Sequence, residues 1–286
     1  MSDEFLAKKQ QAAAWFRTLR NEIVEYFEGL EVLHARGETA RFELTPTLRE
    51  NGGGGLMSVL RGGAVFEKVG VNVSEVHGVL GERAQKAMAA RGVPGMDRDP
   101  RFWASGISLV AHMVNPHAPA VHMNTRMFWT PHACWFGGGA DLNPCIEYAP
   151  DTAHFHAAMQ AACDAHHPDY YARFKAWADE YFFIPHRGRA RGVGGIFFDD
   201  LATGDWEADF SLTRDVGRAF LPAFAPLTEK RIATPFTAAD REVQLIHRGL
   251  YAEYNLLYDR GTKFGLESGH DANAVLMSLP PIAKWT

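Results

Sequence analysis

The sequence predicts an α+β fold, in which a large antiparallel β-sheet is packed between α-helices in a single domain spanning residues 1–286. Segments with alternating polar and apolar residues outnumber the helical segments that could serve as crossovers between parallel strands. Many of these strands are separated only by short glycine or proline turns, which typically join antiparallel neighbours. The chain shows no internal repeat, linker or charged tail, so one domain is expected rather than two.

The composition excludes several classes of protein. Hydrophobic residues make up 47% and charged residues 22% of the 286 residues, which excludes a disordered chain or a coiled coil as the main state. The net charge of −5 provides no basic surface for nucleic acid, so a few placed arginines must hold any anionic ligand. No apolar run reaches the roughly 18 residues that span a bilayer, so no membrane insertion is expected.

The cysteines indicate a reducing compartment. Cys134, Cys145 and Cys163 are odd in number and form no C-x-x-C pair, which argues against a disulfide framework or a cysteine zinc site. The N-terminal stretch lacks the charged, apolar and cleavage regions of a signal peptide. We therefore expect reduced thiols and a cytoplasmic protein.

The first third of the chain predicts one helix followed by short strands. Apolar residues recur every three or four positions between Trp15 and Phe27, which indicates an amphipathic helix. Glycine turns at 52–55 and 62–63 then separate the strands. No Gly-Lys-Ser/Thr follows the first run, so it is expected to be a flexible turn or a loop that closes over a ligand, not a phosphate loop. The predicted strands are 41–45, 56–60, 64–66 and 70–73.

Helices and strands are mixed through the rest of the chain. A short helix over 82–91 ends at Gly92 and Pro94, and Thr237 caps a later one. Pro222 should stop or kink the helix that reaches it. The predicted strands are 108–114, 121–129, 133–136, 193–198 and 250–258. The predicted helices are 151–166, one that starts at 168, one near 212–221 and 238–248.

The strand over 121–129 carries a distinctive polar pattern. Side chains alternate between the two faces of a sheet, so His122, Asn124 and Arg126 share one face. Such a row belongs either to a solvated face or to a polar pocket. It lacks the Lys and Glu typical of a wet face, and the helices are numerous enough to cover both faces, which favours a pocket. In the preceding strand, Ser108 and His112 share one face.

Three acidic segments are candidates for chemistry, each with a structural alternative. Asp141 follows Gly137-Gly138-Gly139, a loop that lets a backbone approach a flat ligand, and is either a turn residue or a carboxylate that accepts N–H donors or removes a proton. The pair Asp199-Asp200 is interpreted as a strand-end turn rather than a Mg²⁺ site, because no nucleotide loop accompanies it. The pair Asp259-Arg260 is either a surface ion pair or an anion-binding loop.

Histidines are concentrated in the middle of the chain, where nine of the 13 lie between His112 and His186. Four of them, His112, His122, His156 and His186, come from separate elements and could converge on a divalent metal. The neighbouring His154 and His156 do not have the i, i+4 spacing of a helical zinc site. Separate hydrogen-bonded imidazoles are the simpler interpretation, and both remain open.

Taken together, these segments resemble the oxygen-dependent coproporphyrinogen III oxidase family. The matching blocks are specific, follow the family's order and extend over almost the whole chain. They are 65–72 (VFEKVGVN), 121–126 (VHMNTR), 135–142 (WFGGGADL), 179–182 (DEYF), 191–201 (RGVGGIFFDDL) and 258–266 (YDRGTKFGL).

The resemblance implies an oxidoreductase with a large, flat antiparallel sheet between helices. The implied reaction is oxidative decarboxylation of two propionate groups of coproporphyrinogen III to vinyl groups, which gives protoporphyrinogen IX in haem biosynthesis. Molecular oxygen is the implied co-substrate, carbon dioxide and hydrogen peroxide leave, and no organic cofactor is implied. The family also implies a homodimer, with approximately 250–286 contributing to its interface.

The resemblance further implies residue roles. His122 is implied as a proton donor, Asp141 as the carboxylate that accepts pyrrole N–H groups, and Arg126 with Arg260 as clamps on substrate carboxylates. The family's metal positions match His112, His122, His156 and His186, so an acid role and a metal role compete for His122. The implied substrate-binding residues are Ser108, Asn124, Thr125, Arg126, Asp259, Arg260, Gly269, His270 and Asp271.

Two other functions stay open. The clustered histidines fit a metal-dependent enzyme of another class. The polar sheet face and the glycine run also fit a non-catalytic tetrapyrrole carrier, which would bind product about as well as substrate and show no turnover.

Overall fold

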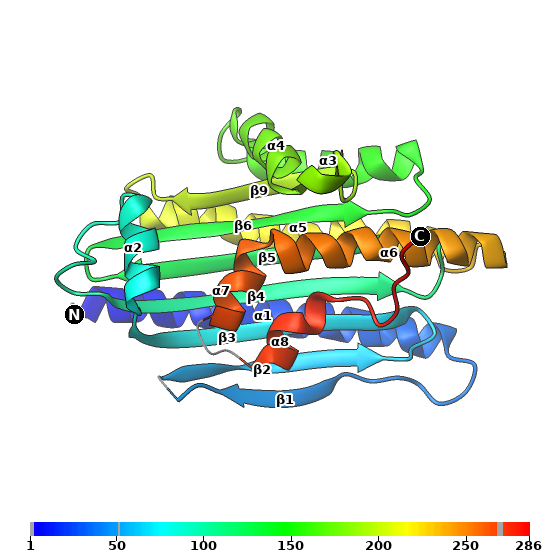
Figure 1. Ribbon diagram of the computed structural model, residues 1–286, viewed down its shortest axis with the longest axis horizontal. Helices are drawn as coiled ribbons and strands as arrows, with labels where there is room; N and C mark the ends of the chain where they lie inside the picture. The colour runs from blue at the N-terminus through cyan, green and yellow to red at the C-terminus, as the bar shows by residue number, and fades with distance from the viewer. Residues whose placement is uncertain (1–2, 51, 268–270) are drawn as a thin grey trace.

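The computed structural model describes residues 3–50, 52–267 and 271–286. Its centre is a seven-stranded sheet in the order β1-β2-β3-β4-β5-β6-β9 (Figure 1). All neighbouring strands in it run antiparallel, so the prediction of an α+β fold with an antiparallel sheet is confirmed. The strands are β1 (Glu43–Leu48), β2 (Gly53–Arg61), β3 (Phe66–Val79), β4 (Arg101–Met113), β5 (Ala120–Thr130), β6 (Ala133–Asn143) and β9 (Gly194–Leu201).

Helices cover both faces of this sheet (Figure 1). The back face packs against α1 (Asp3–His34) and α5 (Trp206–Arg231). The front face carries α2 (Glu82–Ala90), α6 (Ala238–Leu257), α7 (Arg260–Glu267), α8 (Ala272–Val275) and the short η2 (Leu276–Ser278). Beside the edge strand β9 lie α3 (Ala149–Asp164) and α4 (Tyr170–Tyr181), followed by a small ribbon of β7 (Phe183–Ile184), η1 (Pro185–Arg187) and β8 (Arg189–Ala190).

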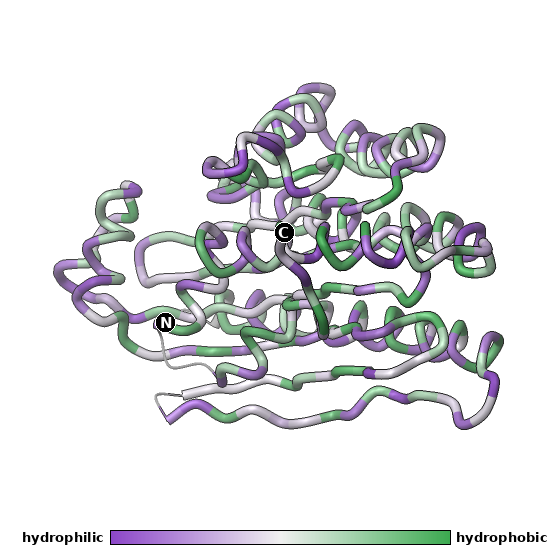
Figure 2. The backbone as a smooth tube through the Cα atoms, turned by 45° about the vertical axis from the view of Figure 1, so that its right-hand side comes forward, coloured by the Kyte–Doolittle hydropathy of each residue, from purple (hydrophilic) through white to green (hydrophobic). Residues whose placement is uncertain are grey.

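The main core lies between the back face and the helices α1 and α5. Alternate residues of the strands point into it, as Met123 and Met127 of β5 do, and they pack with helix residues such as Phe27 and Phe220. Figure 2 shows how hydrophobic and hydrophilic residues alternate along the chain. Burial of this apolar stripe of each helix is what holds the helices to the sheet.

Two smaller apolar clusters lie on the front face and leave a polar band between them. One lies under α2 and includes Phe102 and Phe128. The other joins Phe182, Phe197 and Tyr254, next to α4 and α6. The polar side chains of β5 lie between these clusters, so the two clusters act as walls for a polar site.

The predicted turn at 62–63 is confirmed, whereas the turn predicted at 52–55 and the loop predicted at 137–139 are wrong, because most of these glycines lie inside strands. Gly53–Gly55 belongs to β2, and Gly137–Gly139 belongs to β6, which continues to Asn143. A Cβ added to Gly54 would lie 2.1 Å from the carbonyl oxygen of Thr47 on β1. Glycine here permits a close approach of neighbouring backbones, so it extends the strands instead of ending them.

Two predictions near the C-terminus are also wrong. Residues 250–258, predicted as a strand, mostly form the last turns of α6, where Tyr251 and Tyr254 are buried three residues apart. The helix predicted near 212–221, stopped or kinked by Pro222, does not stop there but continues as α5 to Arg231. Burial of one face of α5 offsets the hydrogen bonds that its prolines remove, a case of tertiary packing overriding propensity.

Sheet side chains fix the C-terminal segment to the front face. Lys68 Nζ donates a hydrogen bond to the carbonyl oxygen of Leu279 (2.8 Å), and His112 Nε2 lies 2.9 Å from that of Ser278. Because a carbonyl only accepts, His112 carries a proton on Nε2. Within the described residues, no helix has both the length and the apolar character needed to cross a bilayer.

We expect His112 to make the fold sensitive to acid. Burial lowers the pKa of His112 from 6.5 to about 3, although the bond to Ser278 acts in the opposite direction. The unfolded chain therefore binds a proton below about pH 6.5 that the folded chain does not, so stability is lost as the pH falls from about 6.5 towards 3. Between pH 7 and pH 5 this loss amounts to about 2 kcal/mol for one such histidine.

Urea unfolding of the wild type and of His112→Gln at pH 7 and pH 5 measures this loss. The free energy of unfolding should fall by about 2 kcal/mol more in the wild type than in His112→Gln. The exposed His154, replaced in His154→Gln, should leave the wild-type pH dependence in place. Equal losses in the wild type and His112→Gln would contradict the assignment of His112 as a buried neutral group.

Candidate active site

The side chains of His122, Asn124 and Arg126 on β5, called the polar row below, lie on a part of the sheet that carries few other side chains. This part, called the floor below, is formed with the glycines of β4 and β6. Antiparallel register places Arg126 between Gly106 of β4 and Gly137 of β6, and Asn124 between Ser108 and Gly139. A Cβ on Gly137 would lie 3.0 Å from the guanidinium carbon of Arg126. A Cβ on Gly106 would lie 2.9 Å from the Cβ of Arg126. Glycine is therefore required on both sides of Arg126, and the front face is flat there.

A chain of polar contacts runs along β5 and into β6. His122 Nδ1 lies 2.8 Å from Asp141 Oδ1, and Asn124 Nδ2 lies 3.2 Å from His122 Nε2. Arg126 Nη1 donates a long bond of 3.4 Å to Asn124 Oδ1. An ionised Asp141 only accepts, so His122 donates its Nδ1 proton, and Nε2 is the acceptor for Asn124. The row is thus a directed series of bonds that ends on a carboxylate.

Asp141 is held by a buried ion pair. Arg191 donates two bonds to it, from Nε to Oδ2 (2.9 Å) and from Nη2 to Oδ1 (2.7 Å). Asn143 Nδ2 donates a third to Oδ2 (2.8 Å). The side chains of Asp141 and Arg191 are only 1% and 2% exposed, so the pair is shielded from solvent.

Aromatic rings surround the guanidinium of this pair. The guanidinium carbon of Arg191 lies 4.3 Å from the ring centre of Phe182 and 4.6 Å from that of Tyr254. Burial alone would raise the pKa of Asp141 and lower that of Arg191. The mutual attraction of the two charges outweighs burial, so the pKa of Asp141 is held well below its usual range and that of Arg191 above its own. Both groups are ionised.

This geometry changes the expected role of Asp141. The sequence left Asp141 as a turn residue or a functional carboxylate after a glycine loop, and the resemblance implied that it accepts substrate N–H groups, but it lies in β6 directly opposite His122. All of its close acceptor positions are taken by Arg191, His122 and Asn143. Asp141 therefore orients His122. The other ring nitrogen of His122, Nε2, points towards Asn124.

A second charged group lies at the other end of the row. Asp199 of β9 is buried, and three arginines from different elements surround it. Arg126 Nη2 lies 2.9 Å from Oδ1, while Arg91 Nη2 and Arg260 Nη2 lie 3.1 and 3.7 Å from Oδ2. Burial raises the pKa of Asp199, but these three charges outweigh burial and lower it. Asp199, which the sequence analysis assigned to a strand-end turn, thus brings together Arg126 and Arg260, the two arginines expected to bind substrate carboxylates.

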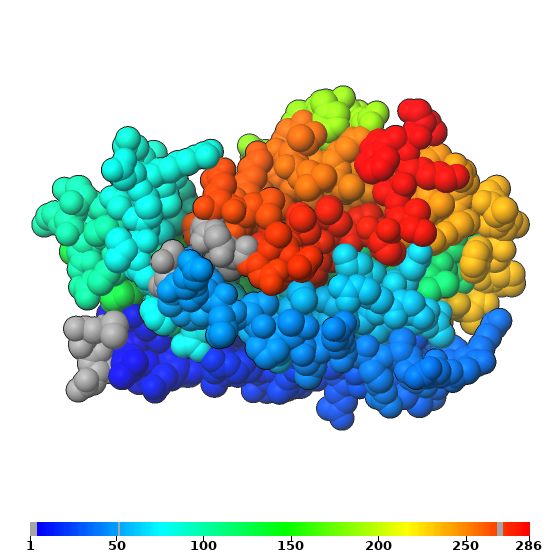
Figure 3. Space-filling view, turned by 60° about the horizontal axis from the view of Figure 1, so that its bottom comes forward, coloured from blue at the N-terminus to red at the C-terminus, as the bar shows by residue number. Residues whose placement is uncertain are grey.

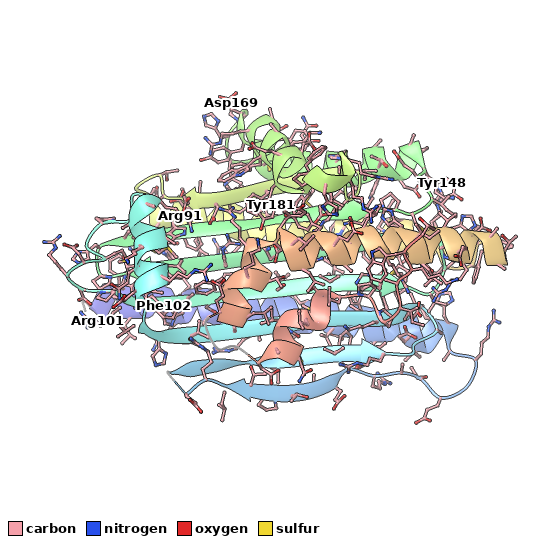
Figure 4. The ribbon with its side chains drawn as sticks, in the orientation of Figure 1. Arg91, Arg101, Phe102, Tyr148, Asp169 and Tyr181 are labelled. Atoms are coloured by element: carbon pink, nitrogen blue, oxygen red, sulfur yellow. The ribbon has the colours of Figure 1, made fainter. Side chains whose placement is uncertain are left out.

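Asp199 and Asp200 lie within the last residues of β9, at an irregularity of the sheet, and not in a turn after the strand. Phe136 pairs with Leu201 and Gly138 with Phe198, so two residues of β9 face the single Gly137 of β6. Asp200 has a φ of 54°, in the left-handed region. It also forms an ion pair with Arg91. Figure 4 shows Arg91 and Tyr181 over the same part of the sheet, between α2 and the C-terminal helices.

The remaining predicted substrate-binding residues are placed differently from one another. Ser108 lies on the front face beside Asn124. Thr125 lies on the back face and is fully buried near α5, so its side chain cannot reach a ligand on the front face. Asp259 accepts bonds from Thr262 and from the Tyr181 hydroxyl, and so fixes the start of α7. Asp271 caps α8, and Gly269 and His270 lie outside the described residues.

The four histidines predicted as metal ligands do not converge. His112 is bound to the Ser278 carbonyl, and His122 to Asp141. His156 of α3 contacts the Tyr171 hydroxyl and the Val193 carbonyl, and His186 contacts Tyr258 and Glu253. Across residues 3–50, 52–267 and 271–286, no group of three or more His, Cys, Asp or Glu could hold a metal ion. The arrangement of this chain therefore does not fit the implied metal site, because each imidazole has another partner.

Sequence reasoning missed three residues of the site: Arg91, Arg191 and Asp199. The composition indicated that a few placed arginines must hold any anion, but not which of them. Asp199 was visible as part of an acidic pair after an apolar strand, yet strand ends commonly carry such residues. The contacts of Asp199 join segments up to 108 residues apart, which no local pattern reports.

A cavity of about 610 Å³ lies elsewhere, between the middle of α1 and the strands β1 to β4. Its wall includes Arg17, Arg20 and the Gly53–Gly55 segment, and none of the residues of the polar row. The site described above is instead an open band of the front face. Figure 3 shows the surface notched between the segment of α2 and that of α6 and α7.

Comparison with known proteins agrees with the resemblance. A sequence model of the coproporphyrinogen III oxidase family matches residues 11–286. A protein of Rickettsia bellii (strain OSU 85-389), named oxygen-dependent coproporphyrinogen-III oxidase, is 46% identical over 280 residues, which are 97% of this chain and 98% of the relative. Its counterpart of the same name in Rickettsia peacockii (strain Rustic) is 45% identical over 283 residues, covering 98% of this chain and 99% of the relative. The chain belongs to the coproporphyrinogen III oxidase family.

Proposed function

We propose that this chain catalyses the oxidative decarboxylation of coproporphyrinogen III to protoporphyrinogen IX. The observation that carries the proposal is the polar row on the glycine floor, with the Asp141–His122 pair at one end and the arginines around Asp199 at the other. Each of two propionic acid groups would react with one O₂, so that R–CH₂–CH₂–COOH becomes R–CH=CH₂ with release of CO₂ and H₂O₂. Oxygen is the oxidant in this proposal, and no organic cofactor is invoked.

The shape and charge of the site support this substrate. A reduced tetrapyrrole is a broad ring with carboxylates on its rim, and the floor around Gly106, Gly137 and Gly139 leaves room for such a body. Arg126 and Arg260 lie at one end of the floor and present planar donors that match carboxylates. Asn124 and His122 lie next to them on the same face of β5, and would face a ring bound on this floor.

The Asp141–His122 pair supports a proton transfer at one atom. His122 donates its Nδ1 proton to Asp141, so Nε2 is unprotonated, and its lone pair accepts the bond from Asn124 that a substrate N–H would replace. Nε2 would accept a proton from substrate, such as that of a pyrrole N–H, which makes the ring more electron-rich towards oxygen. The ionised Asp141 stabilises the resulting imidazolium, which can then act as the proton donor. One residue would thus serve as base first and as acid later.

We also propose that the chain works as one domain in the cytoplasm and as a homodimer through residues 250–286. Five large apolar side chains of this region are 44–58% exposed: Leu256, Leu257, Leu266, Ile282 and Trp285. Apolar groups exposed together are typical of surfaces that bind another protein. The cysteines Cys134, Cys145 and Cys163 are all unpaired, as expected for a reducing compartment.

Purified protein should consume coproporphyrinogen III in air and not under anaerobic conditions. If the chain is the proposed enzyme, one CO₂ and one H₂O₂ should be released for each propionate that is lost. Dialysis against EDTA should leave turnover unchanged, because the four candidate histidines have other partners. Equal turnover with and without oxygen would exclude an oxygen-dependent enzyme. Binding without turnover would indicate a carrier, and loss of activity that only added metal restores would indicate a metal enzyme.

His122→Gln should separate the enzyme from a carrier. It removes the proton-accepting Nε2 while leaving the Asp141–Arg191 pair and the arginines in place, so kcat should fall by about 10²-fold or more. Binding of coproporphyrin III, followed by fluorescence, should change by only a few-fold. His154→Gln, a control on the exposed side of α3, should keep wild-type kcat. A His122→Gln variant with near-normal kcat would exclude His122 as the group that transfers the proton.

The proposed dimer can be tested by light scattering. The wild type should have twice the 31.8 kDa mass of the chain. The double variant Leu256→Glu/Leu257→Glu should dissociate, because it places charges in a desolvated contact. Leu33→Glu, at a still more exposed apolar residue on α1, should remain dimeric. A monomeric wild type, or dissociation caused by Leu33→Glu alone, would contradict an interface at 250–286.

A further inference from the structure

We infer that Arg91 is a third carboxylate-binding arginine of this site, and that Asp199 positions Arg91, Arg126 and Arg260 for a substrate with several carboxylates. The inference rests on the proposed function and extends it to residues that the resemblance leaves without a role. Arg91 follows α2, Arg126 lies in β5 and Arg260 begins α7. Only folding brings these three segments together.

The three guanidinium groups are held in place but not covered. The side chains of Arg91, Arg126 and Arg260 are 32%, 35% and 49% exposed, whereas Asp199 is only 4% exposed. Arg260 is also supported by the ring of Tyr181, 5.0 Å from its guanidinium carbon. Each arginine therefore has donors directed away from Asp199. Asp199 acts as a buried anchor, and the outer N–H groups remain for a ligand.

The charges of the cluster do not cancel. Three arginines form ion pairs with only two carboxylates, those of Asp199 and Asp200. The nearby Asp259 is bound instead by Thr262 and Tyr181. Asp199 Oδ1 is buried and lies 2.9 Å from Arg126, but it accepts no well-aligned hydrogen bond from any described residue. An excess of positive charge beside a partly satisfied anchor favours an anion on the open side. Since the chain as a whole has a net charge of −5, this local excess is a feature of the site and not of the surface in general.

The sheet irregularity at Asp199 and Asp200 supports a functional reason for this geometry. The left-handed φ of Asp200 costs on the order of 1 kcal/mol in a residue that is not glycine. The extra residue in β9 leaves Asp199 beneath the three arginines and allows Asp200 to bind Arg91 as well. A regular strand would present only one of these two carboxylates on the front face. The strained backbone of Asp200 therefore lies where its carboxylate binds Arg91.

A third arginine would let the site distinguish ligands by their number of carboxylates. The substrate carries four carboxylates and the product two, so a site with three arginines gains more from the substrate. Arg91→Gln removes one guanidinium that faces the floor and leaves Arg126 and Arg260. It should weaken the binding of a tetracarboxylate much more than that of a dicarboxylate, because a charge-assisted contact is lost only with the former.

The experiment compares the stable porphyrins coproporphyrin III, with four carboxylates, and protoporphyrin IX, with two. Their dissociation constants are measured by fluorescence with the full-length wild type, Arg91→Gln and the control Arg83→Gln. Arg83 lies on the same helix, is 85% exposed and pairs with Glu267 of α7, so the control removes the same charge from α2. Arg91→Gln should raise the dissociation constant of coproporphyrin III by about 10-fold or more and that of protoporphyrin IX by less than about 3-fold. Arg83→Gln should change neither by more than about 2-fold.

Equal effects of Arg91→Gln on both porphyrins, or no effect on either, would overturn the role of Arg91. This outcome is distinct from failure of the proposed function, which shows as absent turnover by the wild type whatever the porphyrins do. If the variant unfolds, Asp200→Asn replaces it, since asparagine tolerates the left-handed conformation and only the second partner of Arg91 loses its charge. That variant should shift the same ratio of dissociation constants in the opposite direction, because Arg91 loses a competing carboxylate and gains a donor for the tetracarboxylate. An unchanged ratio would again overturn the inference.

Asp199 is tested as a positioning residue by Asp199→Asn. The asparagine keeps the shape but not the charge that holds the arginines together, so kcat should fall by about 10-fold or more, while coproporphyrin III binds at least as tightly as to the wild type. A purely structural role would weaken both porphyrins equally, and that result would overturn the positioning role. Unchanged kcat would overturn it as well.

Discussion

The buried pair of Asp141 and Arg191 is the interaction on which the site depends. Removing two charges from water costs several kcal/mol for each ion, and only a bidentate geometry with further hydrogen bonds offsets this. The pair is therefore a poor device for stability alone. Its effect is on His122, which is left with one tautomer and one orientation. Everything that the polar row can do chemically follows from a proton being fixed on Nδ1 and absent from Nε2.

The fold could be predicted from sequence where periodicity and burial agree. Alternation in 121–129 gave the correct faces of β5, and the 3.6-residue period gave α1, because a core on one side selects such patterns. Prediction failed where glycine permits a close backbone approach, as in β2 and β6, since the same residue also marks turns. It failed again at 250–258, where aromatic residues spaced for a helix also suit a strand.

The site was predictable in part for the same reason. The face shared by His122, Asn124 and Arg126 follows from the period of two, and family resemblance adds Arg260. The partners of these residues do not follow, since Arg191 meets Asp141 across 50 positions and Arg91 meets Asp199 across 108. Ion pairs at such separations depend on how strands and helices are ordered in space. The burial of Asp141 behind His122 could not be predicted either, because burial of this kind has no local sequence signal.

The thinness of the sheet has a consequence for variants far from the polar row. Asn124 and Arg126 face the site, but the residue between them, Thr125, is packed on the opposite side next to Gly217 of α5. A Cβ at Gly217 would lie 2.7 Å from a terminal carbon of Leu19 on α1, so the Leu19 side chain beneath this strand would have to move. An overpacked methyl group there would shift β5, and with it the side chains on its front face, by fractions of an ångström. Turnover depends on donors that are aligned to a similar tolerance. A substitution on the back face of the sheet would therefore lower turnover, as a substitution in the site itself does.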